Sequence, residues 1–95
     1  MDKNGYPDEE ELKQIETWNG NDLVGLMDYV HDLWHWPDWG WNQDGNRYAI
    51  STGGWSGNED IIAALERNFI FWAMCWQVSR RGGHYEFEIP ERLNQ

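Results

Sequence analysis

The fold class is decided by one stretch in the middle of the chain, residues 38–52, which reads DWGWNQDGNRYAIST. Residue types alternate on both sides of the pair Asp44-Gly45, and a period of two is typical of a half-buried strand. Asp-Gly suits a type I′ turn, because both central positions of that turn need a positive φ. The inward-facing positions of the alternation are Trp39, Trp41, Tyr48, Ile50 and Thr52. We therefore predict a β-hairpin over residues 38–52.

Two helices are predicted before this hairpin. A proline followed by four acids at residues 7–11 is typical of a helix N-terminus, so the first helix is expected over residues 7–18. A narrow apolar stripe predicts the second helix over residues 21–36. It ends there because Pro37 disfavours helical geometry at Trp36.

The chain after the hairpin predicts a long helix and a last strand. Asn58 is a suitable cap for a helix over residues 58–81, which Gly82 would end. Trp72 lies on an apolar stripe of this helix and is expected at the centre of the core. Alternation then predicts a strand over residues 83–89.

These elements give an α+β fold in the order ααββαβ. Because the long helix crosses back over the sheet, the last strand should run parallel to the second strand and lie beside the first. The result is a three-stranded, mainly antiparallel sheet with three helices packed on one face. No linker or repeat divides the sequence, so residues 1–95 are expected to form one domain with tails at 1–6 and 90–95.

Charge is distributed unevenly along the chain. The 95 residues carry a net charge of −10, and residues 1–44 hold eleven acids against two lysines. Such a field repels nucleic acid and anionic lipid and favours a basic protein partner, although solubility alone also explains it. Cys75 has no partner for an intramolecular disulfide. Residues 1–4 lack the pattern of a leader and no apolar run has the length of a membrane span, so we expect neither. We therefore expect a cytoplasmic protein that binds neither nucleic acid nor membranes directly.

Two surfaces of the predicted helices are candidates for binding a partner. The first is acidic and lies on the first two helices. Its members are Asp8, Glu9, Glu10, Glu11, Glu16, Asp22, Asp28 and Asp32. The second is an apolar stripe left over on the long helix, formed by Ile70 and Met74. This stripe is either the contact of a homodimer or, in a monomer, covered by the first helix.

Basic residues and tryptophans supply two candidate ligand sites. The basic residues are expected to approach one another and to hold an anion, because guanidinium groups pair with oxyanions. Arginine at a helix C-terminus also complements the helix dipole without binding anything. These residues are Arg47, Arg80, Arg81 and His84. Trp36 and Trp55 are the tryptophans least needed for packing, so their ring faces are candidates for binding a sugar or a methylated amine.

Neither a metal site nor a catalytic site is predicted. His31 and His35 stand four residues apart, but no third His or Cys is near them in the sequence. The glycine-rich loop before the long helix contains no Lys or Arg and fits no nucleotide-binding motif. A Ser-His-Asp triad can be written with Ser51 or Ser56, His35 and Asp38, but no nucleophile elbow accompanies it. We therefore expect no catalytic residue, no metal and no cofactor.

The motif ISTGGWSGNEDII at residues 50–62 is followed by Phe71, Trp72, Cys75 and Trp76, and then by SRRGGHY at residues 79–85. Together these residues resemble a family of small uncharacterised phage and prophage proteins, over residues 10–89. The resemblance implies a phage or prophage origin and a bacterial host. It implies no catalytic residues.

The sequence is thus interpreted as a small acidic accessory protein of phage type that binds a host or phage protein with a basic surface. In the sharpest form of this hypothesis, the acidic surface mimics DNA and inhibits a host nucleic-acid-binding protein. The alternative is a module that binds a small ligand or an anion. An enzyme has the weakest support.

Overall fold

An antiparallel sheet of four strands organises the protein, whose computed structural model describes residues 3–90. In their order across the sheet, the strands are β1 (Trp41–Asp44), β2 (Arg47–Ser51), β4 (His84–Glu88) and β3 (Trp76–Arg80). β1 and β2 form one hairpin, β3 and β4 form another, and β2 pairs with β4 at the centre. The predicted α+β class is confirmed.

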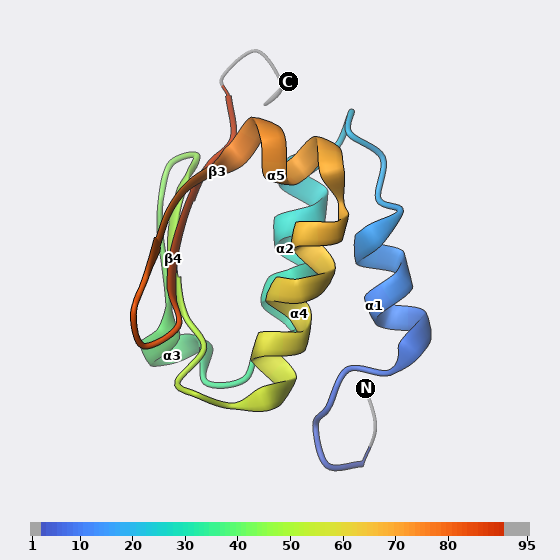
Figure 1. Cartoon of the computed structure of the whole chain (residues 1–95), viewed down its shortest axis with the longest axis vertical. Coiled ribbons are helices and arrows are strands. Elements are labelled where there is room, and N and C mark those ends of the chain that lie inside the picture. Colours follow the sequence, from blue (N-terminus) through green and yellow to red (C-terminus); the bar gives the residue numbers. More distant parts are fainter. Residues whose placement is uncertain (1–2, 91–95) are drawn as a thin grey trace.

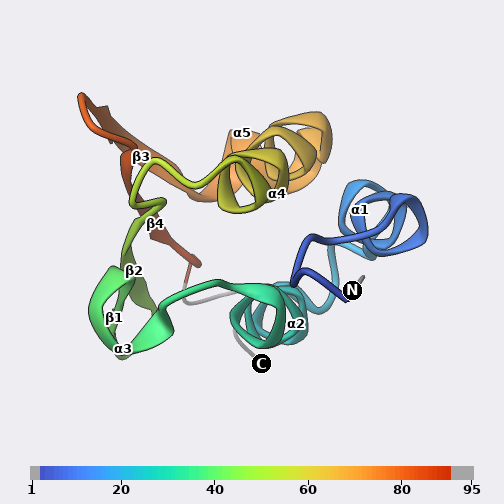
Figure 2. The ribbon, with the colours of Figure 1, turned by 90° about the horizontal axis from the view of Figure 1, so that it is seen from below.

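Helices cover one face of this sheet. Figures 1 and 2 show α2, α4 and α5 between the sheet and α1, which lies farthest from the strands. The short α3 lies at the end of the sheet where β1 begins (Figure 1). The other face of the sheet carries no helix among the described residues (Figure 2). The helices are α1 (Glu9–Glu16), α2 (Leu23–Leu33), α3 (Pro37–Gly40), α4 (Ser56–Arg67) and α5 (Phe69–Cys75).

Side-chain caps explain where the first two helices begin. The Asp8 carboxylate accepts a hydrogen bond from the Glu11 amide, and the Glu11 carboxylate accepts one from the Asp8 amide, which forms a capping box. The Asp22 carboxylate caps α2 by accepting a bond from the third residue of that helix. α1 and α2 therefore lie inside the ranges 7–18 and 21–36 that the sequence predicts.

The prediction of one long helix over residues 58–81 is wrong. The helix breaks at Asn68, whose side chain accepts a hydrogen bond from the Phe71 amide and donates one to the Ile15 carbonyl. Asparagine competes in this way with the backbone bonds of a continuous helix. The second piece, α5, ends at Cys75, and the chain continues as β3. The sheet therefore has a fourth strand, and the protein has more helices than the predicted three.

The extra strand also corrects the predicted position of the last one. β4 lies beside β2 and antiparallel to it, rather than beside the first strand and parallel to the second. The crossing helices do return the chain parallel to β2, but the strand that follows them is β3. Gly82 and Gly83, with φ of 84° and 79°, then reverse the chain into β4, which pairs between β2 and β3.

The hairpin predicted over residues 38–52 begins later than expected. Residues Pro37–Gly40 form α3, so Trp39 does not lie on a strand and is 68% exposed. The turn between the strands starts at Gly45, which has a φ of 63°, one residue later than predicted. The two strands themselves pair antiparallel, as the alternation indicates.

The core lies between the sheet and the helices on its covered face. Phe71 and Phe87 are fully buried, and their ring centroids are 5.1 Å apart. Trp72, expected at the centre, is only partly buried, and Phe69 on the same predicted stripe is 80% exposed. The stripe assumed an unbroken helix, and the break at Asn68 changes which residues face inward. The largest other fully buried apolar residues are Ile15, Leu23, Leu26, Met27, Val30, Ile50, Ile61, Leu65 and Ile89.

The chain before α1 is not a free tail throughout. Tyr6 packs against Trp55, with ring centroids 4.7 Å apart, although residues 1–6 were expected as a tail. Of the other expected tail, 90–95, all but the first residue lies outside the described part of the chain. None of the described helices is long and apolar enough to cross a membrane.

Candidate functional site

A hollow of about 430 Å³ lies along α1 and faces a tyrosine of α2. We name it the acidic groove, and its lining residues are Asp8, Glu10, Glu11, Gln14, Trp18 and Tyr29. The carboxylates come from the cap and first turn of α1. The aromatic wall is formed by Trp18 and Tyr29, whose ring centroids are 5.2 Å apart. The indole N–H of Trp18 donates to the Asp22 carbonyl at 2.8 Å, which fixes the ring beside α2.

The carboxylates give the acidic groove a negative potential. The Glu11 amide, which donates to Asp8, is the main cause that lowers the pKa of the Asp8 carboxyl. Burial, and then the negative charges of Glu11 and Asp8, raise the pKa of Tyr29. Asp8 is therefore held ionised and Tyr29 is held neutral. A neutral aromatic wall beside ionised carboxylates is suited to a cationic side chain with an apolar stem.

The other acidic residues predicted as one surface are not gathered in this groove. Glu16 forms an ion pair with Arg67 at 3.2 Å, and Asp22 is occupied as the cap of α2. Asp28 is exposed and does not line the groove, and its charge contributes to raising the pKa of Tyr48, although burial is the main cause. The remaining two, Glu9 and Asp32, are exposed but do not line the groove.

Of the four basic residues expected to form an anion site, three lie together at the turn between β3 and β4, and Arg47 lies apart from them. Arg47 lies opposite Glu88 and binds it at 3.1 Å, whereas His84 lies opposite Ser51, at the other end of β2. Arg80 lies near His84 but pairs with Glu86 at 3.6 Å, and Arg81 follows it in the turn. Arg47 was expected near the other three because the sequence predicts a helix that ends at residue 81, whereas the helix breaks at Asn68. Arg47, Arg80 and His84 each lie beside a glutamate of β4.

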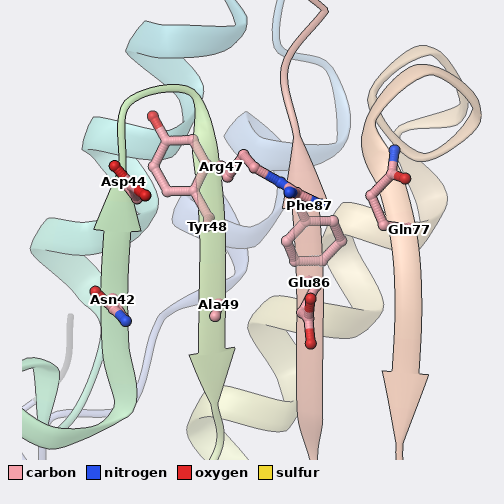
Figure 3. A pocket seen from close by; sticks show the side chains of 8 residues that line it. All are labelled: Asn42, Asp44, Arg47, Tyr48, Ala49, Gln77, Glu86 and Phe87. Atoms are coloured by element: carbon pink, nitrogen blue, oxygen red, sulfur yellow. The ribbon is translucent and has the colours of Figure 1, made fainter.

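Figure 3 shows the face of the sheet that carries no helix, with the Arg47 side chain extending across β4. The depression in this face has a volume of only about 80 Å³. Small-molecule sites are usually clefts of about 300–1,000 Å³. This face therefore offers paired charges rather than a ligand pocket.

A Ser-His-Glu relay on the same face was missed by sequence reasoning. Ser51 Oγ lies 3.0 Å from His84 Nδ1, and His84 Nε2 lies 3.2 Å from Glu86 Oε2. The signal that could have found it is the cross-strand pairing of Ser51 with His84. Ser51 sits in regular register within β2, not on the strained turn that exposes a nucleophile. The three side chains are therefore joined by a regular cross-strand contact, without the geometry of a nucleophile elbow.

The histidines of α2 and its C-terminus are used for packing. His31 packs edge-on against Trp41, with ring centroids 5.0 Å apart, and His35 stacks on Trp55 at 4.3 Å. No group of three or more His, Cys, Asp or Glu side chains within residues 3–90 is placed to hold a metal ion. Trp55, predicted as a free ring, is thus covered by His35 and Tyr6.

Ile70 and Met74 lie one turn apart on α5 but differ in exposure. Ile70 is 53% exposed, and a Cβ added to Gly20 would lie 2.8 Å from it, so the loop after α1 contacts this side chain. Met74 packs against the core. α1 packs on α4, and the exposed Ile70 is therefore not buried under α1. A homodimer through these two residues stays a prediction.

Cys75 is expected to be almost unreactive in the folded protein. Burial raises the pKa of its thiol to about 12, so the thiolate fraction at pH 8 falls roughly 1,000-fold below that of an unfolded cysteine. A thiol-reactive disulfide reagent should label the protein slowly in buffer and rapidly in urea. Labelling in buffer at the rate of free glutathione would contradict the buried position.

Comparison of the chain with protein-family models, with curated proteins and with solved structures finds no match.

Proposed function

We propose that the protein is a small acidic accessory protein, of phage or prophage type, that binds a basic segment of a host or phage protein. The observation that supports this most directly is the acidic groove, in which three carboxylates line a hollow beside two aromatic rings. A lysine or arginine side chain would place its charge near the carboxylates and its stem against Trp18 and Tyr29. The overall charge of −10 would speed the approach of such a partner.

Two neighbouring glutamates are matched in exposure and in helix position, but only one of them lines the acidic groove. Glu10 lines it and Glu9 does not, although both are exposed and both lie in the first turn of α1. Glu11 is unsuitable for a test because its side chain completes the capping box. Reversal of Glu9 or Glu10 to lysine therefore changes the net charge and the helix dipole equally and differs only in the groove.

We expect Glu10→Lys to weaken capture of the partner from a bacterial host lysate by about tenfold, and Glu9→Lys to weaken it much less. The two variants should melt at nearly the same temperature. Binding of the wild-type protein should also fall steeply between low and moderate salt, because exposed charges are screened. Equal loss in both variants, or binding that ignores salt, would refute a role for the groove.

The sharper form of the proposal is inhibition of a host nucleic-acid-binding protein. In that case the carboxylates of α1 take the place of DNA phosphates on the partner. A short DNA duplex should then displace the partner from the immobilised wild-type protein. If the partner binds the duplex and this protein at the same time, DNA mimicry is refuted, whereas the proposal of protein binding is unaffected.

A further inference from the structure

A second hollow, unconnected with the acidic groove, lies beside α3. It is lined by Trp36, Asp38, Trp39 and Gly53, and its volume is about 420 Å³. We name it the tryptophan hollow. The two indole rings have centroids 6.3 Å apart and planes inclined by 57°, and they are 48% and 68% exposed. Large aromatic rings bury most of their surface in a folded core, so two open rings around one hollow need an explanation.

The backbone holds Trp36 in an unusual conformation that places its ring at the hollow. Its φ of 63° makes it the one non-glycine residue with a positive φ within residues 3–90, and L-residues with a Cβ rarely adopt this region. The buried Asn58 amide fixes the preceding residue, accepting from the His35 amide and donating to the His35 carbonyl, both at 2.9 Å. Such conformations persist only where the surroundings enforce them, and they concentrate at binding sites.

Gly53 brings the loop after β2 against both rings. A Cβ at this position would lie 2.9 Å from Trp36 and 3.3 Å from Trp39. The glycine therefore lets the loop reach the base of the hollow without a side chain filling it. Its φ of 66° also favours glycine here.

The chemistry of the lining selects the class of ligand. Two indole faces attract a cation through their electron-rich rings, and the exposed Asp38 carboxylate adds a negative charge at the rim. Within residues 3–90, no lysine or arginine lines the hollow. A sugar could stack on these rings, but its many hydroxyl groups would share one carboxylate and two indole N–H groups. A quaternary ammonium group has no N–H to satisfy and suits the lining better.

We propose that the tryptophan hollow binds a trimethylammonium group. The group enters between Trp36 and Trp39, with its methyl groups against the ring faces and its charge toward Asp38. It belongs either to a small free molecule such as choline or to a trimethylated lysine side chain. This site is independent of the acidic groove, so either proposal can fail alone.

Binding should be measured by NMR of the indole N–H groups, with choline as the probe. We expect a Kd on the order of 1 mM, the range open to so small a ligand, and shifts confined to Trp36 and Trp39 and their neighbours. 3,3-Dimethylbutan-1-ol has the shape of choline without its charge and should bind at least about tenfold more weakly. A peptide carrying trimethyllysine that binds far tighter than choline identifies the side chain as the source, and equal affinity identifies the free molecule.

Variants separate the roles of the rings and the charge. Trp39→Ala should weaken choline binding by about tenfold, and Asp38→Asn by a smaller factor of about three. Trp36→Gly removes the other ring while keeping a residue that accepts the positive φ. Trp76→Ala is the matched control, because this ring is 42% exposed but lies on β3, away from the hollow, and it should leave binding unchanged. The proposal is overturned if choline and its neutral analogue bind equally, if Trp39→Ala has no effect, or if cellobiose shifts the same signals at lower concentration.

Discussion

Replacement of Asn58 with alanine is expected to lower the free energy of unfolding by about 2–4 kcal/mol, because it leaves the half-buried amide and carbonyl of His35 without their hydrogen-bond partner. The Thr52 carbonyl also loses a bond but still accepts from the Trp55 amide. The Asn58 side chain is fully buried. It accepts from the His35 amide and donates to the carbonyls of His35 and Thr52. It therefore joins the start of α4 to the end of α2 and to the end of β2. Urea unfolding of the variant measures the loss, and Asn42→Ala, at an exposed strand position, is the control that should change stability little.

The isosteric variant Asn58→Asp tests the same contacts through pH. Its first oxygen can still accept from the His35 amide, but the second faces two carbonyl oxygens and cannot donate unless it is protonated. The folded pKa of this carboxyl should therefore rise above its unfolded value of about 3.9. The stability of the variant should be highest below that unfolded pKa and should be lost as the pH rises through the folded pKa. If its stability relative to the wild type does not change between pH 4 and pH 7, the three hydrogen bonds are wrongly placed.

Replacement of Phe71 with alanine should cost about 3–5 kcal/mol of unfolding free energy, the usual loss for a buried phenylalanine. Phe71 is fully buried against Phe87, at the point where α5 meets the sheet. Trp72 is only partly buried, with its ring edge-on to Phe87 and stacked on Trp76. Trp72→Ala should therefore cost less than Phe71→Ala, although the larger ring would cost more if the sequence-based stripe were correct.

Phe69 completes this comparison within one helix. It is 80% exposed, so Phe69→Ala should change the unfolding free energy by no more than about 0.5 kcal/mol. Urea unfolding of the three variants under one set of conditions measures the three losses of unfolding free energy. The largest loss identifies the side chain of α5 that faces the core. A loss at Phe69 equal to that at Phe71 would mean that the long unbroken helix predicted from the sequence is the right description.

The sequence predicts those elements whose signals are local. The acids after Pro7, the stripe of the second helix and the alternation around Tyr48 each specify an element without reference to the rest of the chain. Asn68 could not be interpreted from local signals, because its side chain binds the Ile15 carbonyl, more than fifty residues away. An asparagine that breaks a helix and one that is exposed on a helix look the same in a sequence. That ambiguity explains why the sequence predicts a helix that continues to residue 81. It also explains why β3 is not predicted.

The candidate sites were predicted less well than the elements, for the same physical reason. Glu10 and Glu11 were identified as acidic partner residues, but Tyr29, the wall opposite them, was not. Trp36 was identified as a free ring, whereas its partner Trp39 was assigned to a strand and so to the core. The basic cluster depended on strand register, and the pairing of Arg47 with Glu88 could not be known before the position of β4.

The strand order β1-β2-β4-β3 also constrains how fast the protein can fold. Each outer strand pairs with its neighbour in the chain, so both hairpins can close within microseconds. The central pairing of β2 with β4 is different, because it joins Ser51 to His84, 33 residues apart, across α4 and α5. Closing that loop costs the chain conformational entropy. The hydrogen bonds of the central ladder offset this cost only after the loop has closed. We therefore expect two early hairpins and a slower step in which they join, with the crossing helices already collapsed against them.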